Sequence, residues 1–226
     1  MAPKQLICLA CSRKHGGYCF AGMELSTGLW IRPIGKHENG TLSMTDCCLA
    51  SGNGTFQLPN LLDVIEIDFV APEPSRAQSE NWRISGAEWK RVRRPEVADL
   101  TILMRNITED PELFRGYERY VSKRDIELRP PNCSLALVRP ETLRWRPETD
   151  RYGHKRFRGT FTFSGMTYDL PLTDDVYAAR LRGNATIDGL SDASIEILLT
   201  ISLGDLYEDT GRYYKLIAGV VELARS

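Results

Sequence analysis

The sequence predicts a mainly β protein made of two small antiparallel barrels that are joined by a helical segment. Strand patterns recur about five times before residue 95 and about five times again after residue 125. Helical patterns lie between these halves, and few strands are separated by the long crossover that a parallel sheet requires. Short, strongly alternating strands, about five in each half, fit a small Greek-key barrel such as the OB-fold. We therefore expect a first barrel over residues 1–94, a helical connector over 95–125 and a second barrel over 126–226.

The strands of the first barrel follow from apolar runs and from period-two alternation. The clearest pattern is residues 63–70, where Ile65, Ile67 and Phe69 share one face. The stretch RKHGG at residues 13–17 supplies a hairpin loop, because glycine takes a positive φ without strain. The expected strands are residues 5–12, 18–25, 28–34, 63–70 and 81–85.

Helical signals replace the strand patterns in the middle of the chain. Pro95 suits the first turn of a helix, and apolar residues from 97 to 107 recur at helical spacing. Asp110 and Pro111 mark a second start, although Gly116 weakens the helix that would follow. The sequence therefore predicts one helix after Pro95 and another that ends near Val121.

Strand patterns resume in the second barrel. Ser164 and Gly165 form a two-residue hairpin signal between two alternating runs, and Asp174 is the expected cap of a short helix. The expected strands are residues 133–138, with 142–148 as the extension of that strand, 155–163, 166–172, 197–204 and 213–223.

Composition places the chain among ordinary globular proteins. It has 226 residues, 42% hydrophobic and 26% charged, with a net charge of −1 and a pI near 6.3. Any affinity for a polyanion must therefore come from local clusters of charge. No apolar run approaches the ~20 residues of a membrane helix, and the N-terminus lacks the pattern of a signal peptide. We expect a cytoplasmic protein with no membrane partner, whose six cysteines are reduced thiols.

Trp30 and Arg32 form the first candidate site, in the stretch GLWIRPIG at residues 28–35. They share one face of the expected strand, which Pro33 ends. An exposed indole stacks a nucleobase, and a neighbouring guanidinium binds phosphate. In the structural alternative, Trp30 plugs the end of a barrel and Arg32 pairs with a carboxylate such as Glu24.

The hairpin loop SRKHGG is the second candidate. Consecutive backbone N–H groups in a glycine-containing turn can form an anion-binding nest, and two cations and an imidazole stand beside them. In an OB barrel this loop borders the usual ligand face. The alternative is a solvated hairpin tip. The candidate residues are Ser12, Lys14, His15, Gly16 and Gly17.

Two further stretches concentrate cations beside aromatic residues. The first, WKRVRRPE at residues 89–96, has four cations next to a tryptophan, but charge runs are commonly solvated surface. The second, residues 139–158, mixes seven cations with aromatic residues and a histidine, a pattern typical of single-stranded nucleic-acid or nucleotide binding. Its candidate contacts are Arg144, Trp145, Arg146, Lys155 and Arg156.

Neither a metal site nor a catalytic site is predicted. Cys8 and Cys11 form a C-x-x-C pair, but positions three apart on a strand face opposite sides, and the pair Cys47-Cys48 is adjacent instead of spaced. Buried thiols are the expected explanation. Motifs for a metalloprotease, a nucleophilic serine or a phosphate-binding loop are absent from the sequence. We expect no metal, no cofactor and no enzymatic activity; a nuclease or hydrolase is an alternative without a motif.

Three stretches resemble the dual OB-domain proteins of bacterial conflict and anti-phage systems. These are ICLACSRKHGGYCFAG at residues 7–22, GLWIRPI at 28–34 and SLGDLYEDTGRYYKLIAGVVE at 202–222. The resemblance implies two OB-like barrels and a role in sensing nucleic acid or a nucleotide-derived ligand beside an effector. It supplies no established chemistry. The positions that it marks are Ser12, Lys14, Gly16, Gly17, Cys19, Gly22, Trp30, Arg32 and Pro33.

The leading functional hypothesis is a non-enzymatic module that binds single-stranded nucleic acid or a nucleotide and acts with an effector protein. The alternative is a structural subunit of a defence complex that binds only protein. The acidic pI favours this alternative, because dedicated DNA-binding domains are usually basic.

Overall fold

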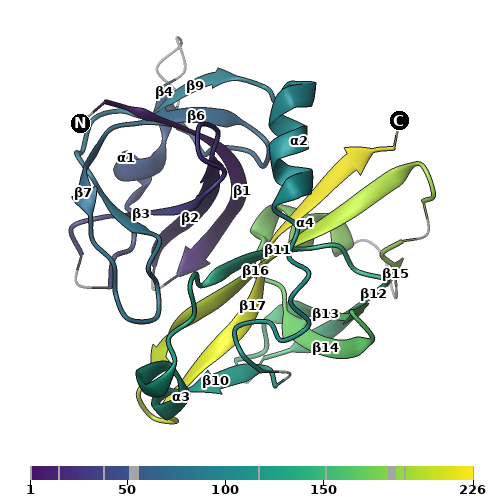
Figure 1. Ribbon diagram of the computed structural model, residues 1–226. Coiled ribbons are helices and arrows are strands. Elements are labelled where there is room, and N and C mark those ends of the chain that lie inside the picture. The colour runs from purple at the N-terminus through teal and green to yellow at the C-terminus, as the bar shows by residue number, and fades with distance from the viewer. Residues whose placement is uncertain are drawn as a thin grey trace. The chain divides into compact units, whose positions relative to one another are not determined.

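The computed structural model divides the chain into two compact units, Met1–Asn106 and Ile107–Ser226, and each is considered by itself (Figure 1). The boundary falls inside the expected connector. The structure describes residues 2–14, 16–37, 39–50, 56–116, 118–150, 152–182, 187–190 and 192–225. Over these residues, no helix combines the length and the apolar character needed to span a membrane.

The first unit is built around one sheet of short strands. Its strands are β1 (Lys4–Lys14), β2 (Gly17–Glu24), β3 (Trp30–Ile34), β6 (Val64–Ile67), β7 (Phe69–Pro72), β8 (Asn81–Ile84) and β9 (Lys90–Arg93). A separate pair consists of β4 (Leu49–Ala50) and β5 (Phe56–Gln57). The helices are α1 (Met44–Cys47) and α2 (Val97–Arg105).

Strand order shows that this sheet closes on itself. The order is β7-β8-β3-β2-β1-β6-β9, and β6 and β7 are separated in the chain only by Asp68. One bent strand therefore pairs with β1 at one side and with β8 at the other. The pairing of β3 with β8 is parallel, whereas β1, β2 and β3 pair antiparallel. These pairings confirm the small barrel that the sequence predicts.

The core of the first barrel lies where the alternating apolar residues meet. The buried side chains include Leu6 and Cys8 of β1, Phe20 of β2 and Trp89. The Phe20 and Trp89 rings pack edge to face, with their centres 4.9 Å apart. Burying each large side chain contributes roughly 1.5–3 kcal/mol. Because the inward positions are filled by these side chains, the interior of this barrel is a packed core.

The second unit contains two sheets. One has the order β14-β13-β12-β15 and the other β10-β17-β16-β11. The strands are β10 (Tyr120–Ser122), β11 (Leu135–Val138), β12 (Thr142–Thr149), β13 (Lys155–Phe163), β14 (Met166–Pro171), β15 (Ile187–Asp188), β16 (Ile195–Tyr207) and β17 (Arg212–Ala224). The helices are α3 (Lys123–Leu128) and α4 (Asp175–Leu181).

Connectivity in the second unit repeats that of the first. Strands β12, β13 and β14 pair antiparallel in succession, α4 follows, and β16 and β17 form the last hairpin. A parallel bridge between Leu172 and Ile217 joins the end of β14 to β17, as β3 joins β8 in the first unit. The short strand β15 pairs with β12 on the other side. The OB-like fold class is therefore confirmed for both halves.

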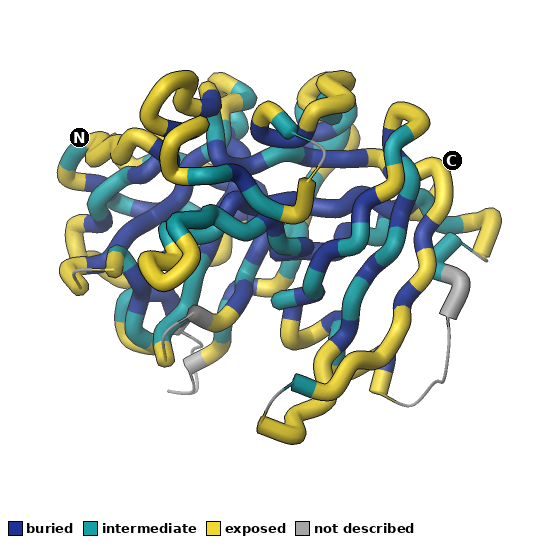
Figure 2. The backbone as a smooth tube through the Cα atoms, turned by 90° about the horizontal axis from the view of Figure 1, so that it is seen from below, coloured by how far each residue is buried: buried dark blue, intermediate teal, exposed yellow. Residues whose placement is uncertain are grey.

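Trp145 fixes which way β12 faces. Its indole is 1% exposed and lies opposite Gly159 of β13. A Cβ at Gly159 would come within 2.8 Å of the Trp145 ring and 2.7 Å of Ile217, so only glycine fits beneath this ring. Because side chains alternate along a strand, Arg144 and Arg146 must point to solvent. Figure 2 shows this change between buried and exposed residues along the strands.

The helical middle of the chain differs in part from the prediction. The first expected helix is present as α2, which begins after Glu96 and belongs to the first unit. The second expected helix is not formed over the described residues 110–116 and 118–121, because Phe114 and Arg115 take left-handed φ values of 55° and 65°. The chain instead enters strand β10, and Ser122 then caps the unexpected helix α3.

A buried lysine ties this non-helical segment to the second barrel. The Lys215 side chain is fully buried, donates a hydrogen bond to the Gly116 carbonyl and lies 5.5 Å from the centre of the Tyr168 ring. The Tyr168 hydroxyl in turn donates to the Pro111 carbonyl at 2.6 Å. Burial lowers the pKa of Lys215 to about 8, because the ammonium loses hydration that these contacts replace only in part.

We predict that the stability of the protein rises with pH above 8 because of Lys215. The folded pKa is about 8 against an ordinary value of 10.5, so the unfolded chain binds more protons between these values. The free energy of unfolding should increase by about 3 kcal/mol across that interval. Urea unfolding at several pH values, compared between wild type and Lys215→Met, isolates this contribution. Parallel pH curves for the two proteins would contradict it.

Candidate functional site

The β12–β13 hairpin of the second unit gathers cations on its outer face. Register places Arg146 opposite Arg158 and Glu148 opposite Arg156, while Phe157 between the two arginines of β13 is buried. Lys155 is exposed where β13 begins. The basic hairpin, as we call it, consists of Arg144, Arg146, Tyr152, His154, Lys155, Arg156 and Arg158.

Carboxylates neutralise only part of this charge. Asp169 of β14 accepts from Arg146 at 3.1 Å and from Arg158 at 3.0 Å. Asp150 lies 3.4 Å from the Arg156 Nε. Arg144 and Lys155 are exposed and have no ion pair with any side chain that the structure describes. The hairpin therefore retains cations that are available to an anionic ligand.

Asp150 organises the tip of the basic hairpin. Its carboxylate accepts hydrogen bonds from the backbone N–H groups of Tyr152 and His154, each at 2.9 Å, and lies 3.2 Å from the His154 Nδ1. These hydrogen bonds, led by that from His154, lower the pKa of Asp150 to about 2. The turn leaves the Tyr152 side chain 69% exposed, with its ring 6.3 Å from the His154 ring. One aromatic face thus stands beside the cations.

A concavity of about 400 Å³ lies next to the tip. It is lined by His154, Lys155, Arg156 and Arg182, which follows the last turn of α4. All four side chains are basic, so the concavity suits a phosphate or another compact anion. Its volume falls within the range of small-ligand sites.

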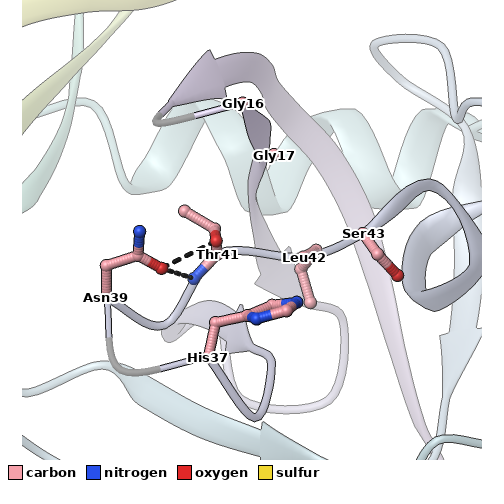
Figure 3. A pocket seen from close by; sticks show the side chains of 7 residues that line it. All are labelled: Gly16, Gly17, His37, Asn39, Thr41, Leu42 and Ser43. Carbon is pink, nitrogen blue, oxygen red and sulfur yellow. Dashed lines mark hydrogen bonds between the residues drawn. The ribbon is translucent and has the colours of Figure 1, made fainter.

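The glycine loop of the first unit lines a different concavity, of about 550 Å³ (Figure 3). Gly16 and Gly17 form one wall, and His37, Asn39 and residues 41–43 form the other. A Cβ at Gly17 would lie 2.8 Å from the Leu42 carbonyl oxygen, so the two walls approach closely. Asn39 Oδ1 accepts from both the N–H and the hydroxyl of Thr41, at 3.1 and 2.7 Å.

The anion-binding role of this loop stays a prediction. Ser12 is only 8% exposed, because it lies in β1 before the turn, and this corrects its placement on the accessible loop. His15 and the side chain of Lys14 lie outside the described residues. Gly16 and Gly17 remain the members of the predicted set that border open space.

Arg32 is not on an exposed binding face, and this corrects the sequence-based expectation. Its side chain is buried, with Nε 3.1 Å from Glu80 Oε1, and its backbone N–H donates to the Glu80 carbonyl. The expected partner Glu24 bonds instead to Lys4 and Thr27, each at 2.7 Å. The reason is the parallel pairing of β3 with β8, which brings Glu80 beside Arg32. Trp30, at the start of β3, is half-buried.

Trp145 is also a core residue and not a ligand contact. Its burial against Gly159 removes the indole from the outer face, and this corrects its place among the candidate contacts. Sequence reasoning also omitted Arg182 and Asp169. Strand alternation around buried Trp145 and Phe157 identifies the outward cations, but no local signal brings α4 to the hairpin.

The cations of residues 89–96 are largely structural. Arg93 bonds to Asp99 of α2, Arg94 reaches the buried Asp63 at 3.0 Å, and Lys90 lies 3.6 Å from Glu66. These ion pairs attach β9 and the start of α2 to the barrel. The stretch is therefore a weaker candidate for polyanion binding than the basic hairpin.

The six cysteines all lie in described residues and are thiols, not disulfides. Burial and the neighbouring thiols of Cys11 and Cys48 raise the pKa of Cys47 to about 12, so it is protonated at neutral pH. Within the described residues, no three or more histidine, cysteine, aspartate or glutamate side chains are grouped so as to hold a metal ion.

The fold and the comparisons with known proteins agree on the class. Two barrels of OB connectivity, the second with a basic hairpin, define a dual OB-fold protein. The sequence profile of the family described as Dual OB-containing domain matches residues 4–220, so the chain belongs to that family. No curated protein matches the chain. A crystal structure of the tetrameric p202 HIN2 is similar at 9% identity, covering 100% of this chain and 94% of that one, with a TM-score of 0.30.

We predict that Arg32 is needed for stability and not for ligand contact. Arg32→Ala leaves Glu80 buried without its cation and should lower the free energy of unfolding by about 3–5 kcal/mol. Lys90→Ala, which breaks a solvent-exposed pair in the same unit, should cost less than about 1 kcal/mol. Urea denaturation measures both. An Arg32→Ala protein of unchanged stability that no longer binds its ligand would show that the residue is a contact.

Proposed function

We propose that this protein is a non-enzymatic module that binds single-stranded nucleic acid through the basic hairpin and acts with an effector protein in a bacterial defence system. The observation that carries the proposal is the hairpin itself. Exposed cations lie on the outer face of β12–β13, and the exposed ring of Tyr152 stands at the tip. Cations bind the phosphates, and the aromatic ring stacks a base.

Single strands fit this arrangement better than duplexes. The face of a base is free to stack on Tyr152 only when the base is not paired. The concavity beside the tip then accepts a phosphate next to the stacked base, or the phosphate of a free nucleotide. The position of the hairpin supports the assignment, because the loop between the first two strands of an OB barrel borders its ligand face.

The effector and the defence setting rest on the resemblance of the motifs to dual OB proteins of conflict systems. Binding through phosphate contacts and stacking breaks no covalent bond, so the proposed role requires no catalytic group. Ligand occupancy of the second barrel is the signal that the effector would detect.

The salt dependence of oligonucleotide binding tests whether the cations of the basic hairpin contact phosphates. Arg144→Ala should lower the log–log salt slope for a labelled single-stranded oligonucleotide by about 0.7 if Arg144 neutralises one phosphate. Arg91→Ala removes the same charge from an exposed position in the first unit and should leave the slope unchanged. Fluorescence anisotropy across a series of salt concentrations gives both values. Equal effects of the two substitutions would mean that net charge, and not this site, governs binding.

Tyr152 tests the stacking contact separately. Tyr152→Ala should weaken oligonucleotide binding by about 1–3 kcal/mol, because the loss of one aromatic platform removes one stacked base. The salt slope should stay nearly constant, since no cation is lost, and Tyr152→Phe should retain most of the affinity. Circular dichroism confirms folding of each variant. If wild type binds no nucleic acid or nucleotide even at low salt, the proposed ligand is wrong.

A further inference from the structure

A second aromatic surface lies on the β10-β17-β16 part of the second unit. Tyr120 of β10 pairs directly with Tyr214 of β17, and their ring centres are 6.1 Å apart. Tyr207 lies at the end of β16, and its ring centre is 6.3 Å from that of Tyr214. We call these three residues the tyrosine surface. Tyr207 is 49% exposed, and Tyr120 and Tyr214 are partly exposed.

This surface lies at the opposite end of the barrel from the basic hairpin. Strand β13 runs from the basic tip to the turn at Ser164 and Gly165, and β14 returns toward that tip. Because β17 runs parallel to β14, its first residues lie at the Ser164 end. Figure 1 agrees, since the β16–β17 turn lies beside β10 and α3, away from the β12 and β15 labels. The two surfaces are therefore separate sites.

Arg212 of the same chain already lies over the Tyr120 ring of this surface. The Arg212 guanidinium lies 4.0 Å from the centre of the Tyr120 ring, well within the distance of a cation–π contact. The side chain comes from the strand next to Tyr120, where Arg212 pairs with Ser122. Tyrosine rings presented in this way hold a guanidinium, and the exposed Tyr207 ring offers a further face of the same kind.

Charge distinguishes the two ends of the barrel. Residues 205–214 contain Asp205, Glu208 and Asp209 against the single base Arg212, a net charge of −2. Residues 150–158 contain one acid and four bases, a net charge of +3. Burial, together with the carboxylates of Glu208, Glu127 and Asp205, raises the pKa of Tyr213, whereas the hydrogen bond to Thr210 and the guanidinium groups of Arg212 and Arg119 lower the pKa of Tyr214. Lys123 lies 3.9 Å from Glu208 and offsets part of this acidic charge, so Asp209 is the carboxylate of the turn that attracts a further cation.

We propose that the tyrosine surface docks an arginine-rich segment of a partner protein. Guanidinium groups would stack on the tyrosine rings, as Arg212 does on Tyr120, and pair with the carboxylates of the β16–β17 turn. Tyrosine and arginine are also the residues that contribute most at protein interfaces. The inference rests on the partner half of the proposed function and uses none of the residues assigned to nucleic-acid binding.

Binding of defined probes to the full chain tests the inference. The probe is a short fluorescein-labelled peptide of alternating arginine and glycine, with the glutamate–glycine peptide as its control. Tyr207→Ala should weaken arginine-peptide binding by roughly two- to five-fold, and Tyr207→Phe should restore it. Asp209→Lys should also weaken it, because it reverses a charge of the turn. Tyr152→Ala, which removes a still more exposed tyrosine ring at the other end, is the matched control and should have no effect.

The outcomes separate this inference from the proposed function. Peptide binding that Tyr207→Ala weakens and Tyr152→Ala leaves intact supports it, whether or not the oligonucleotide binds. No peptide binding, or equal loss in both variants, overturns it. Both substitutions are at exposed hairpin positions, and circular dichroism checks the fold.

Discussion

The packing of the Trp145 indole against Gly159 is the contact that determines which side chains reach the outer face of the second barrel. The indole fits into the interior only because the opposite residue, Gly159, has no side chain. Ile217 of the last strand also packs against the space that a side chain at Gly159 would fill. Once Trp145 is inside, alternation sends Arg144 and Arg146 outward. A shift of register by one residue would bury two guanidinium groups and expose an indole, so the core and the charged face stabilise one another's positions.

The two barrels share their connectivity but use the equivalent regions differently. In the first barrel, the parallel pairing of β3 with β8 buries Arg32 against Glu80. The desolvation of a buried ion pair costs much of the Coulombic energy that the pair gains, so the intact pair adds little net stability, although removing Arg32 alone is destabilising because it leaves a buried carboxylate. The pair fixes the position of the loop before β8. In the second barrel, the ion pairs of the basic hairpin lie at the surface, where they can exchange with a ligand.

Much of this fold is readable from the sequence because strands and tight turns are encoded locally. The hairpin at Ser164 and Gly165 was predictable, and both residues have the positive φ that such a turn requires. The helix expected after Asp110 does not form, because Phe114 and Arg115 take left-handed φ values in a segment that Tyr168 and Lys215 bond at Pro111 and Gly116. Such contacts between distant residues are not encoded locally. For the same reason, no spacing rule predicts a bond between Arg32 and a residue 48 positions away.

The candidate site was predictable in part on the same grounds. The cations and Tyr152 lie on one hairpin, so their proximity follows from the chain itself. The burial of Trp145 follows from the alternation with Leu143, but only if the inward face of β12 is known. The contribution of Arg182 depends on how α4 packs, which no local pattern specifies.

The most direct test of the central claim is to map where a single-stranded oligonucleotide contacts the intact protein. Ultraviolet crosslinking of a photoreactive oligonucleotide, followed by mass spectrometry of the peptides, locates the contact without any substitution. We expect crosslinks within residues 144–158, concentrated at Tyr152. Crosslinks confined to β1–β3 of the first unit, around Gly16 or Trp30, would contradict it.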